Sequence, residues 1–450
     1  MENPDRVPSA GLTPDVLVIG GGPAGSAVAA LLADKRHDVV LLEKTHHPRF
    51  HIGESLLPMN MPLFDRLGIR RQVEDIGITK YGAEFISPWH DHTSDFYFAD
   101  AMDKSFPYAV QVRRSEFDEL LFRHATRRGA RCVEGIRVTH VDLQTDQGAD
   151  RRARVVARTE DGVETLWRPR FVIDASGRDT LLSNQFGIKT RNPDHSSAAL
   201  FGHFTGAWRG SGRREGNISL FWFDHGWFWY IPLRDGAVSV GAVASPAYFR
   251  TRKSDPSTFL METIALAPRL AERLKNATMD APATATGNFS YFSDYCRGDR
   301  FAIIGDAFAF IDPMFSSGVF LAMHSAFESA RAVDHWLRGD LKAAEKAFRR
   351  FEHTMVHGPR MFSWFIYRIT SPAIRKLFMQ PRNVWRMQEA LLSILAGDIF
   401  RSTPVHSRLL GFKVIYYCSC LKLWPQALKT WAWRRRNHRS VLAAESGAAK

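Results

Sequence analysis

Residues 15–25 read Asp-Val-Leu-Val-Ile-Gly-Gly-Gly-Pro-Ala-Gly, and this stretch decides the fold. A short β-branched run leads into a Gly-x-Gly-x-x-Gly turn, and an alanine-rich helix is expected to continue to about Asp34. A second apolar strand is predicted at Val39–Leu42, with Glu43 directly after it. A strand, a glycine-rich turn, a helix and a second strand in this order are typical of a βαβ unit that binds a dinucleotide.

Each glycine of the turn has a physical role. Gly20 makes the tight turn, Gly22 lets the backbone approach the pyrophosphate, and Gly25 lets the helix pack closely on the strand. The phosphates then lie at the positive end of the helix dipole. Glu43 follows Gly20 by 23 residues, where a carboxylate can accept hydrogen bonds from a ribose. The expected cofactor contacts here are Gly20, Gly22, Ala24, Gly25 and Glu43.

Later parts of the chain favour FAD over NAD. Asp306 follows a buried strand predicted at Phe301–Ile304, at the mouth of the sheet, where a carboxylate can hold the ribityl chain. Residues 49–55, Arg-Phe-His-Ile-Gly-Glu-Ser, come soon after the second strand. Within this segment the assigned cofactor contacts are Arg49, Gly53, Glu54 and Ser55, and His51 receives no acid–base role.

These elements resemble the FAD-dependent monooxygenase superfamily related to p-hydroxybenzoate hydroxylase, over about residues 14–190 and 290–330. Arg114 begins a segment that matches the Arg-x-x-Phe-Asp-x-x-Leu helix start of that superfamily. The resemblance implies that Arg114 contacts the cofactor; the alternative is a salt bridge that caps the helix. It also implies an α/β fold, a doubly wound FAD-binding domain with an inserted antiparallel sheet and a helical C-terminal region.

The expected domain organisation is discontinuous. Residues 1–190 and 288–335 form the FAD-binding domain, residues 191–287 the antiparallel sheet of the substrate region, and residues 336–450 a basic helical region.

A second diagnostic stretch is Trp-Phe-Trp-Tyr-Ile-Pro at residues 227–232. Side chains alternate along a strand, so Trp227, Trp229 and Ile231 point to one face while Phe228 and Tyr230 point to the other. By itself this is typical of an aromatic core strand. Two indoles on one face can also form a rigid wall beside a cofactor.

With this strand included, the chain resembles the flavin-dependent halogenases. Residues 310–318, Phe-Ile-Asp-Pro-Met-Phe-Ser-Ser-Gly, fit the pattern Phe-x-x-Pro-x-x-Ser-x-Gly of that family, and Lys80 stands where the family has its catalytic lysine. The resemblance implies that FADH2, O2 and a halide yield hypohalous acid, which Lys80 directs at the substrate. Trp227 and Trp229 would keep the substrate away from the flavin, and backbone amides around Ser317 and Gly318 would bind the halide.

The substrate class is predicted from the same motif. Tryptophan halogenases place a glutamate just before the serine of the Ser-x-Gly turn, and Phe315 stands there in this chain. The chain therefore looks closer to the phenol and pyrrole branch, in which some substrates are free and others are bound to acyl carrier proteins. A separate NAD(P)H-dependent flavin reductase is the predicted partner, since no NAD(P)H domain is evident.

Composition limits the remaining possibilities. The four cysteines form no CxxC pair, no signal peptide is evident, and His46, His47, His90 and His92 are expected at the surface without a third metal ligand; a cytoplasmic protein without a metal is therefore expected. The net charge is +13, and residues 331–450 hold 22 Lys and Arg against 7 Asp and Glu. An acidic carrier protein, an anionic membrane surface and a solvated basic face all fit this surplus, whereas no nucleic-acid motif accompanies it.

Three rival functions use the same FAD-binding frame. A single-component aromatic hydroxylase needs its substrate beside the flavin, which the two tryptophans oppose. A flavin-dependent reductase of a polyprenyl or lipid chain has no use for Lys80. A non-catalytic flavin-holding subunit would have no reason to retain both tryptophans and Lys80.

Overall fold

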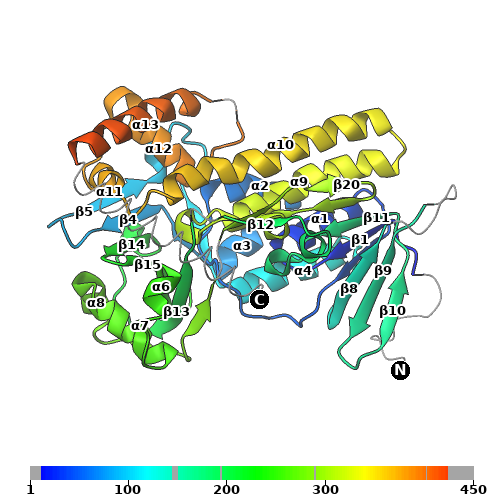
Figure 1. Cartoon of the computed structure of the whole chain (residues 1–450), viewed down its shortest axis with the longest axis horizontal. Helices are drawn as coiled ribbons and strands as arrows, with labels where there is room; N and C mark the ends of the chain where they lie inside the picture. Colours follow the sequence, from blue (N-terminus) through cyan, green and yellow to red (C-terminus); the bar gives the residue numbers. More distant parts are fainter. Residues whose placement is uncertain (1–11, 144–150, 193–194, 288–289, 402, 424–450) are drawn as a thin grey trace, which may run out of the picture.

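The computed structural model describes residues 12–143, 151–192, 195–287, 290–401 and 403–423 (Figure 1). Its central element is a six-stranded sheet in the order β20-β21-β11-β1-β2-β7, parallel except at the β20 edge. The strands are β1 (Val16–Ile19), β2 (Val39–Leu42), β7 (Arg131–Val133), β11 (Phe171–Asp174), β20 (Arg297–Gly298) and β21 (Phe301–Ile303). Because β1 pairs with β2 and β11 along its whole length, the glycine-rich turn leaves from the middle of the carboxyl edge of the sheet.

Helices cover one side of this sheet and a small antiparallel sheet lies on the other (Figure 1). The helices are α1 (Pro23–Ala33), α4 (Arg114–Arg127), α9 (Gly318–Leu337) and α10 (Leu341–Ile366), and the small sheet contains β8 (Ile136–Asp142), β9 (Arg154–Thr159) and β10 (Glu164–Trp167). α1 packs against both α4 and α9. The FAD-binding domain is thus assembled from distant parts of the chain, because β21 and α9 join the N-terminal βαβ unit.

A larger, mostly antiparallel sheet forms the second body. Its order is β17-β13-β16-β15-β14-β4-β5, with β18 also paired to β13. Its strands are β4 (Gly82–Ile86), β5 (Thr93–Tyr97), β13 (Ala198–Thr205), β14 (Ile218–Phe223), β15 (Gly226–Pro232), β16 (Val238–Ala244), β17 (Thr278–Met279) and β18 (Thr284–Thr286). The inserted antiparallel sheet is therefore confirmed. It also takes in residues 82–97, because β4 pairs in parallel with β14; the domain boundaries themselves stay predictions.

The remaining elements are short. The remaining strands are β3 (Gly77–Lys80) paired with β6 (Ala109–Val112), and a sheet of β12 (Lys189–Arg191), β19 (Tyr291–Ser293) and β22 (Ala309–Phe310). The remaining helices before the C-terminal region are α2 (Met61–Leu67), α3 (Arg70–Ile76), α5 (Leu181–Gln185), α6 (Pro246–Phe249), α7 (Pro256–Ala265) and α8 (Pro268–Leu274). One histidine differs from expectation: the side chain of His47 is buried, with Nδ1 2.7 Å from Oε1 of Glu134.

The C-terminal region is helical, as predicted. α11 (Pro372–Met379), α12 (Met387–Ala396) and α13 (Val405–Lys422) lie together beside one end of α10 (Figure 1). The arginine-rich stretch at residues 433–439 lies outside the described residues. Among the helices of the described ranges, none is both long and apolar enough to cross a membrane.

Candidate functional site

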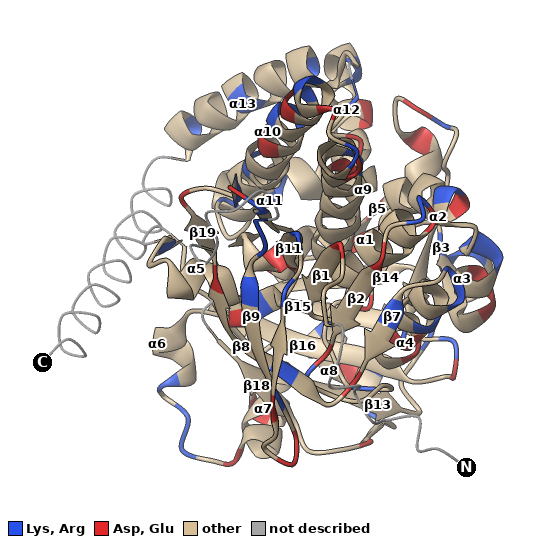
Figure 2. Ribbon diagram, turned by 90° about the vertical axis from the view of Figure 1, so that its right-hand side faces the viewer, with Lys and Arg blue, Asp and Glu red and all other residues tan. Residues whose placement is uncertain are grey.

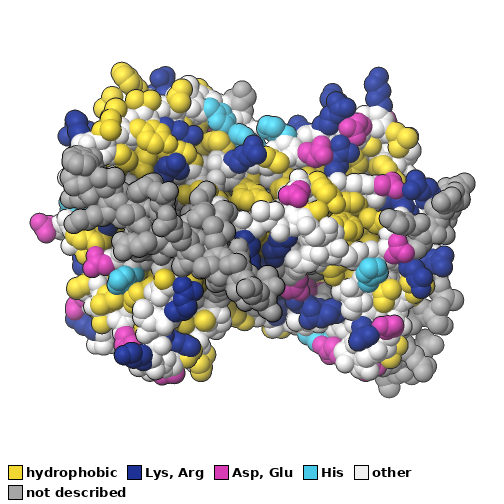
Figure 3. Space-filling model, viewed as in Figure 1, with side chains coloured by type: hydrophobic (Ala, Val, Ile, Leu, Met, Phe, Trp, Pro, Cys, Tyr) yellow, Lys and Arg dark blue, Asp and Glu magenta, His cyan; other side chains and the backbone are white. Residues whose placement is uncertain are grey.

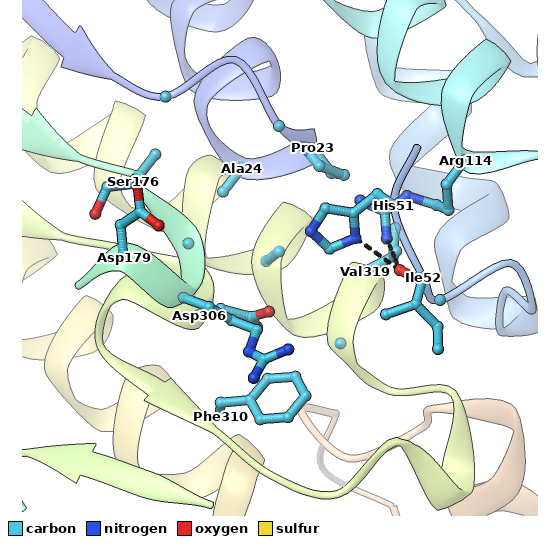
Figure 4. A pocket seen from close by; sticks show the side chains of 18 of the residues that line it. Pro23, Ala24, His51, Ile52, Arg114, Ser176, Asp179, Asp306, Phe310 and Val319 are labelled. Atoms are coloured by element: carbon cyan, nitrogen blue, oxygen red, sulfur yellow. Dashed lines mark hydrogen bonds between the residues drawn. The ribbon is translucent and has the colours of Figure 1, made fainter. Parts of the chain in front are cut away.

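A cavity of about 730 Å³ lies between the carboxyl edge of the parallel sheet and the larger sheet, whose strand β15 contributes Trp227, Trp229 and Ile231 to the lining. Figure 4 shows other lining residues, among them Ala24, Arg114 and Asp306. A volume of this size is typical of cofactor sites. The predicted site residues that line it are Gly20, Gly22, Ala24, Glu43, Arg49, Gly53, Glu54, Ser55, Arg114, Trp227, Trp229, Asp306 and Gly318. Three predicted site residues, Gly25, Lys80 and Ser317, do not line the cavity. Gly25 and Ser317 are next in the sequence to the lining residues Ala24 and Gly318, and Lys80 contacts the lining residue Ser55.

The glycine-rich turn fits a pyrophosphate. Gly20 has φ +100°, and a Cβ on it would lie 2.5 Å from the carbonyl oxygen of Ala175. A Cβ on Gly25 would lie 1.9 Å from the carbonyl oxygen of Gly20, so only glycine allows α1 to approach the strand this closely. At Gly22 the nearest atom is a guanidinium nitrogen of Arg49 at 3.6 Å. The turn therefore leaves an open cradle at the positive N-terminus of α1.

Glu43 and Arg49 add charge at this end of the cavity. Glu43 accepts hydrogen bonds from the backbone N–H of Gly21 at 2.7 Å and from the Thr45 hydroxyl at 2.7 Å. Burial raises the pKa of Glu43, but the Arg49 charge 3.6 Å away and these hydrogen bonds outweigh it and hold the pKa below its usual value. Nε of Arg49 is a buried donor with no acceptor in the described part of the chain. An anionic ligand in the cradle would supply that acceptor, so these residues fit the FAD pyrophosphate.

Residues 49–56, which we call the strap, cross one side of the cavity. Arg114 donates from Nη1 to the carbonyl oxygen of Ile52 at 2.6 Å and forms a two-point ion pair with Asp118 at 2.8 and 3.0 Å. Arg114 therefore makes a salt bridge, which was the alternative to the predicted cofactor contact, and it also anchors the strap from the cavity wall. His51 contacts the same Ile52 carbonyl and faces the cavity (Figure 4). Burial, together with the nearby Arg114 charge, lowers the pKa of His51 to about 4, so the ring is neutral.

The sequence did not predict the partners of Glu54 in the strap and of Asp312 in the segment 310–318. Glu54 accepts from Nε2 of His203 on β13 at 2.9 and 3.1 Å, which ties the strap to the larger sheet. Asp312 is buried and accepts from the Ser197 hydroxyl at 2.6 Å and from His195 at 3.1 Å. Both pairings join residues more than a hundred positions apart, so no local pattern reveals them.

Lys80 lies directly behind the strap. Its Nζ donates to Oγ of Ser55 at 2.9 Å and to the carbonyl oxygen of Leu56 at 3.1 Å, and the ring of Phe98 is 5.3 Å away. The side chain is 2% exposed, and burial lowers the pKa of Lys80 to about 7. β3 ends at this lysine, where its ladder with β6 pairs Lys80 with Ala109. Ser55 lines the cavity on its other side, so one side chain separates a buried amine from the cofactor space.

The indole wall has the predicted geometry. Trp227, Trp229 and Ile231 line the cavity, whereas Phe228 and Tyr230 belong to the core on the opposite face of the sheet. The two indole centroids are 6.1 Å apart. The Trp229 ring is held over β16, because Nε1 donates to Oγ of Ser239 at 3.2 Å and a Cβ on Gly241 would meet the ring at 2.2 Å. These contacts fix the indole against rotation into the cavity.

Residues 310–318 form a tight turn before α9. A 3-10 turn at Pro313–Phe315 is followed by Ser316 with φ +56°, and Ser317 precedes the first residue of the helix, Gly318. A right-handed residue followed by a left-handed one turns successive N–H groups to one side, as in anion-binding nests. Gly318 and Val319 line the cavity, so the N-terminus of this 20-residue helix faces it.

Asp306 lies at the opposite end of the same segment, in the 3-10 turn Gly305–Ala307 that follows β21. Its side chain faces the cavity (Figure 4). Burial raises the pKa of Asp306 to about 6, although the charges of Arg114 and Arg178 oppose the rise. A carboxyl group with this pKa can either accept or donate a hydrogen bond near neutral pH, which suits a hydroxyl-bearing ribityl chain.

Comparisons with known proteins agree with this site. A family model described as an FAD binding domain matches residues 13–353. A tryptophan 2-halogenase of Chondromyces crocatus is 34% identical over 342 residues, which cover 74% of this chain and 64% of that protein. The flavin-dependent halogenase gsfI of Penicillium aethiopicum is 34% identical over 394 residues, covering 82% of this chain and 72% of gsfI. The chain thus spans less than two thirds of the first relative's length and more than two thirds of the second's.

Solved structures show the same relationship. A flavoprotein/dehydrogenase from Cytophaga hutchinsonii superposes with a TM-score of 0.83 at 29% identity, covering 91% of this chain and 99% of that one. The myxobacterial chondrochloren halogenase CndH, described as a variant of FAD-dependent halogenases, superposes with a TM-score of 0.74 at 32% identity. That match covers 87% of this chain and 92% of CndH.

Proposed function

This chain belongs to the flavin-dependent halogenases, which are FAD-binding flavoproteins, and from that premise we propose that it halogenates an electron-rich aromatic substrate with chloride or bromide. FADH2 bound in the cavity supplies two electrons, so that FADH2, O2, a halide and a proton give FAD, hypohalous acid and water. The halogen then replaces a proton on an aromatic carbon of the substrate, and a second water is released.

The single observation that carries this proposal is the position of Lys80. A lysine buried behind the cavity wall, with a pKa lowered to about 7, can donate a hydrogen bond to hypohalous acid or attack it as a free amine. Ser55 holds Nζ of Lys80 at 2.9 Å and also faces the cofactor space. The Ser317–Gly318 turn would hold the halide, and the indoles of Trp227 and Trp229 would exclude the organic substrate from the flavin edge.

A phenolic or pyrrolic substrate, free or bound to a carrier protein, is the proposed class. Phe315 is buried at the place where tryptophan halogenases carry a glutamate, which argues against free tryptophan. Because one relative is named a tryptophan 2-halogenase, tryptophan is included among the compounds to be assayed. We also propose that a separate NAD(P)H-dependent flavin reductase supplies FADH2 and that the protein acts in the cytoplasm.

A flavin-dependent dehydrogenase or reductase is the second candidate, because this chain superposes on the flavoprotein/dehydrogenase of Cytophaga hutchinsonii with a TM-score of 0.83. Such an enzyme needs neither O2 nor a halide. A single-component aromatic hydroxylase is the third, and it would insert oxygen into the substrate without a halide.

One assay separates these functions. The FAD-loaded protein, an external flavin reductase and NADH are incubated in air with phenols, pyrroles and tryptophan, free and carrier-bound, with and without bromide, and the products are weighed by mass spectrometry. The proposal expects a bromine isotope doublet that requires bromide and disappears in Lys80→Ala. Products heavier by one oxygen regardless of bromide would establish the hydroxylase. A parallel incubation under nitrogen separates the remaining function, since a reduced product formed there would establish the reductase.

A further inference from the structure

The outer face of α13 carries a continuous row of exposed apolar side chains. Leu410, Val414, Tyr417 and Leu421 are each between 50% and 75% exposed. Their spacing of four, three and four residues places them on one side of the helix. Isolated exposed apolar residues are common on a protein surface. Four in line along one helix form a patch, and such patches typically mark an interaction site.

The opposite face of α13 anchors the helix to the rest of the protein. Val405, Leu409, Phe412 and Tyr416 are buried there, and Phe412 and Tyr416 contact the rings of Trp364 and Phe365 on α10. The helix is therefore apolar on two sides. One apolar side is buried against the rest of the protein. The other side, which carries the row at residues 410, 414, 417 and 421, is exposed.

The charged side chains of α13 have one sign, since the helix contains Arg408, Lys413 and Lys422 and no acidic residue. In the sequence, residues 405–450 together hold nine Lys and Arg against one glutamate. Figure 2 shows Lys and Arg but no Asp or Glu along α13. In Figure 3 hydrophobic side chains gather at the upper left, over α12 and α13, with Lys and Arg between them.

An apolar row with a basic border is complementary to the interface of an anionic membrane. Leucine, valine and tyrosine side chains would enter the boundary between headgroups and acyl chains, while the cations contact acidic headgroups. An acidic carrier protein would match the cations but offers no apolar layer for four protruding side chains. We propose that the Leu410–Leu421 face of α13 binds the protein peripherally to an anionic lipid surface. This inference does not depend on the proposed halogenase activity.

The test is sedimentation of the full-length, FAD-loaded protein with vesicles. Vesicles of phosphatidylglycerol and phosphatidylcholine should carry the protein down at low salt, and pure phosphatidylcholine vesicles should not. The variant L410S/V414S/Y417S/L421S should partition at least about tenfold more weakly, because burial of these side chains contributes to membrane affinity. Each cation near the surface contributes about fivefold, so raising the salt concentration should also weaken binding.

A matched control replaces four equally exposed apolar residues elsewhere. V163S/L266S/Y295S/L341S changes residues that are between 44% and 66% exposed and lie outside α13, and its vesicle binding should equal that of the parent. Absence of binding to anionic vesicles, or equal binding by both quadruple variants, would overturn the proposal. So would a melting temperature far lower in the α13 variant than in the control, since the chain itself would then cover this face. A concentration-dependent dimer that only the α13 variant abolishes would assign the face to a second copy instead.

Discussion

Nζ of Lys80 and Oγ of Ser55 lie 2.9 Å apart, and this contact joins the wall of the FAD cavity to a buried amine. Lys80 belongs to β3, whereas Ser55 belongs to the strap, so two separate elements set the distance. Because the strap is itself held by Arg114 and by the Glu54–His203 pair, the amine has a fixed position relative to the cofactor space.

Ser55→Ala tests whether this contact tunes the lysine. The serine oxygen accepts from the charged amine and so favours the protonated form; without it the pKa of Lys80 falls further below about 7. The ionisation that controls halogenation should therefore move to lower pH, by about one unit for a lost contact of about 1.4 kcal/mol. The measurement is the pH–rate profile of halogenated product. Ser329→Ala is the control: it removes a buried hydroxyl that donates to the carbonyl oxygen of Ala326 within α9, and it should leave the pH–rate profile unchanged. An unchanged profile in Ser55→Ala would contradict the expectation.

Trp229→Phe tests the indole wall. The smaller ring opens space beside the cavity and releases the hydrogen bond to Ser239, so substrate can approach the flavin edge. Halogenated product should fall several-fold per FADH2 consumed, while released hydrogen peroxide or oxygenated product rises. Product and peroxide are quantified in the same reaction. Phe228→Leu, on the opposite face of the same strand, should keep the parent's product ratio and lose only stability.

The fold was largely readable from the sequence because its main signals are local. The turn at residues 20–25, the strand at Val39–Leu42 and the alternation across residues 227–232 each depend on neighbours a few positions away. The polar pairs were not readable, because Glu54 with His203 and Asp312 with His195 are brought together only by folding. Lys80 was assigned from a motif, and neither its burial nor its contact with Ser55 follows from β3 alone.

Gly25→Ala should abolish FAD loading. The added methyl carbon would lie 1.9 Å from the carbonyl oxygen of Gly20, so α1 must move away from the pyrophosphate cradle. We expect at least a hundredfold weaker FAD binding, measured by flavin fluorescence during titration of the apoprotein. Gly287→Ala is the control, since a Cβ there meets no atom of the described residues within 4 Å. Parent-like FAD affinity in Gly25→Ala would show that the turn does not hold the phosphates.

Asp312→Asn should weaken halide binding without affecting FAD. The buried carboxylate accepts hydrogen bonds from the Ser197 hydroxyl, the His195 ring and the N–H of Met314. It therefore fixes the start of the turn that is proposed to hold the halide. An asparagine side chain has one acceptor oxygen and an NH2 donor in place of two acceptor oxygens, so one of these contacts is lost. The turn then loosens while the cavity keeps its shape. The KM for bromide should rise about tenfold, with a smaller change in kcat and an unchanged flavin absorption spectrum. Asp235→Asn, at a largely exposed ion pair with Arg113, should leave the bromide KM as in the parent.

The pH dependence of the free energy of unfolding of Lys80→Met, compared with the parent, tests whether the pKa of Lys80 is lowered. Burial lowers the pKa of Lys80 from 10.5 to about 7, so between these pH values the unfolded chain binds a proton that the folded protein does not. The cost of the buried lysine is therefore greatest below pH 7 and disappears as the pH rises toward 10.5. Lys80→Met should gain stability over the parent at pH 7, on the order of a few kcal/mol, and lose about 1.4 kcal/mol of that gain per pH unit up to pH 10. Urea unfolding of both FAD-loaded proteins at pH 7, 8 and 9 measures the difference. Lys275→Met, at an exposed lysine paired with Glu272, is the control for replacing a lysine by methionine. A difference that does not vary with pH for Lys80→Met would mean that Lys80 keeps an ordinary pKa in the folded protein. The free-amine route to hypohalous acid would then be closed near neutral pH.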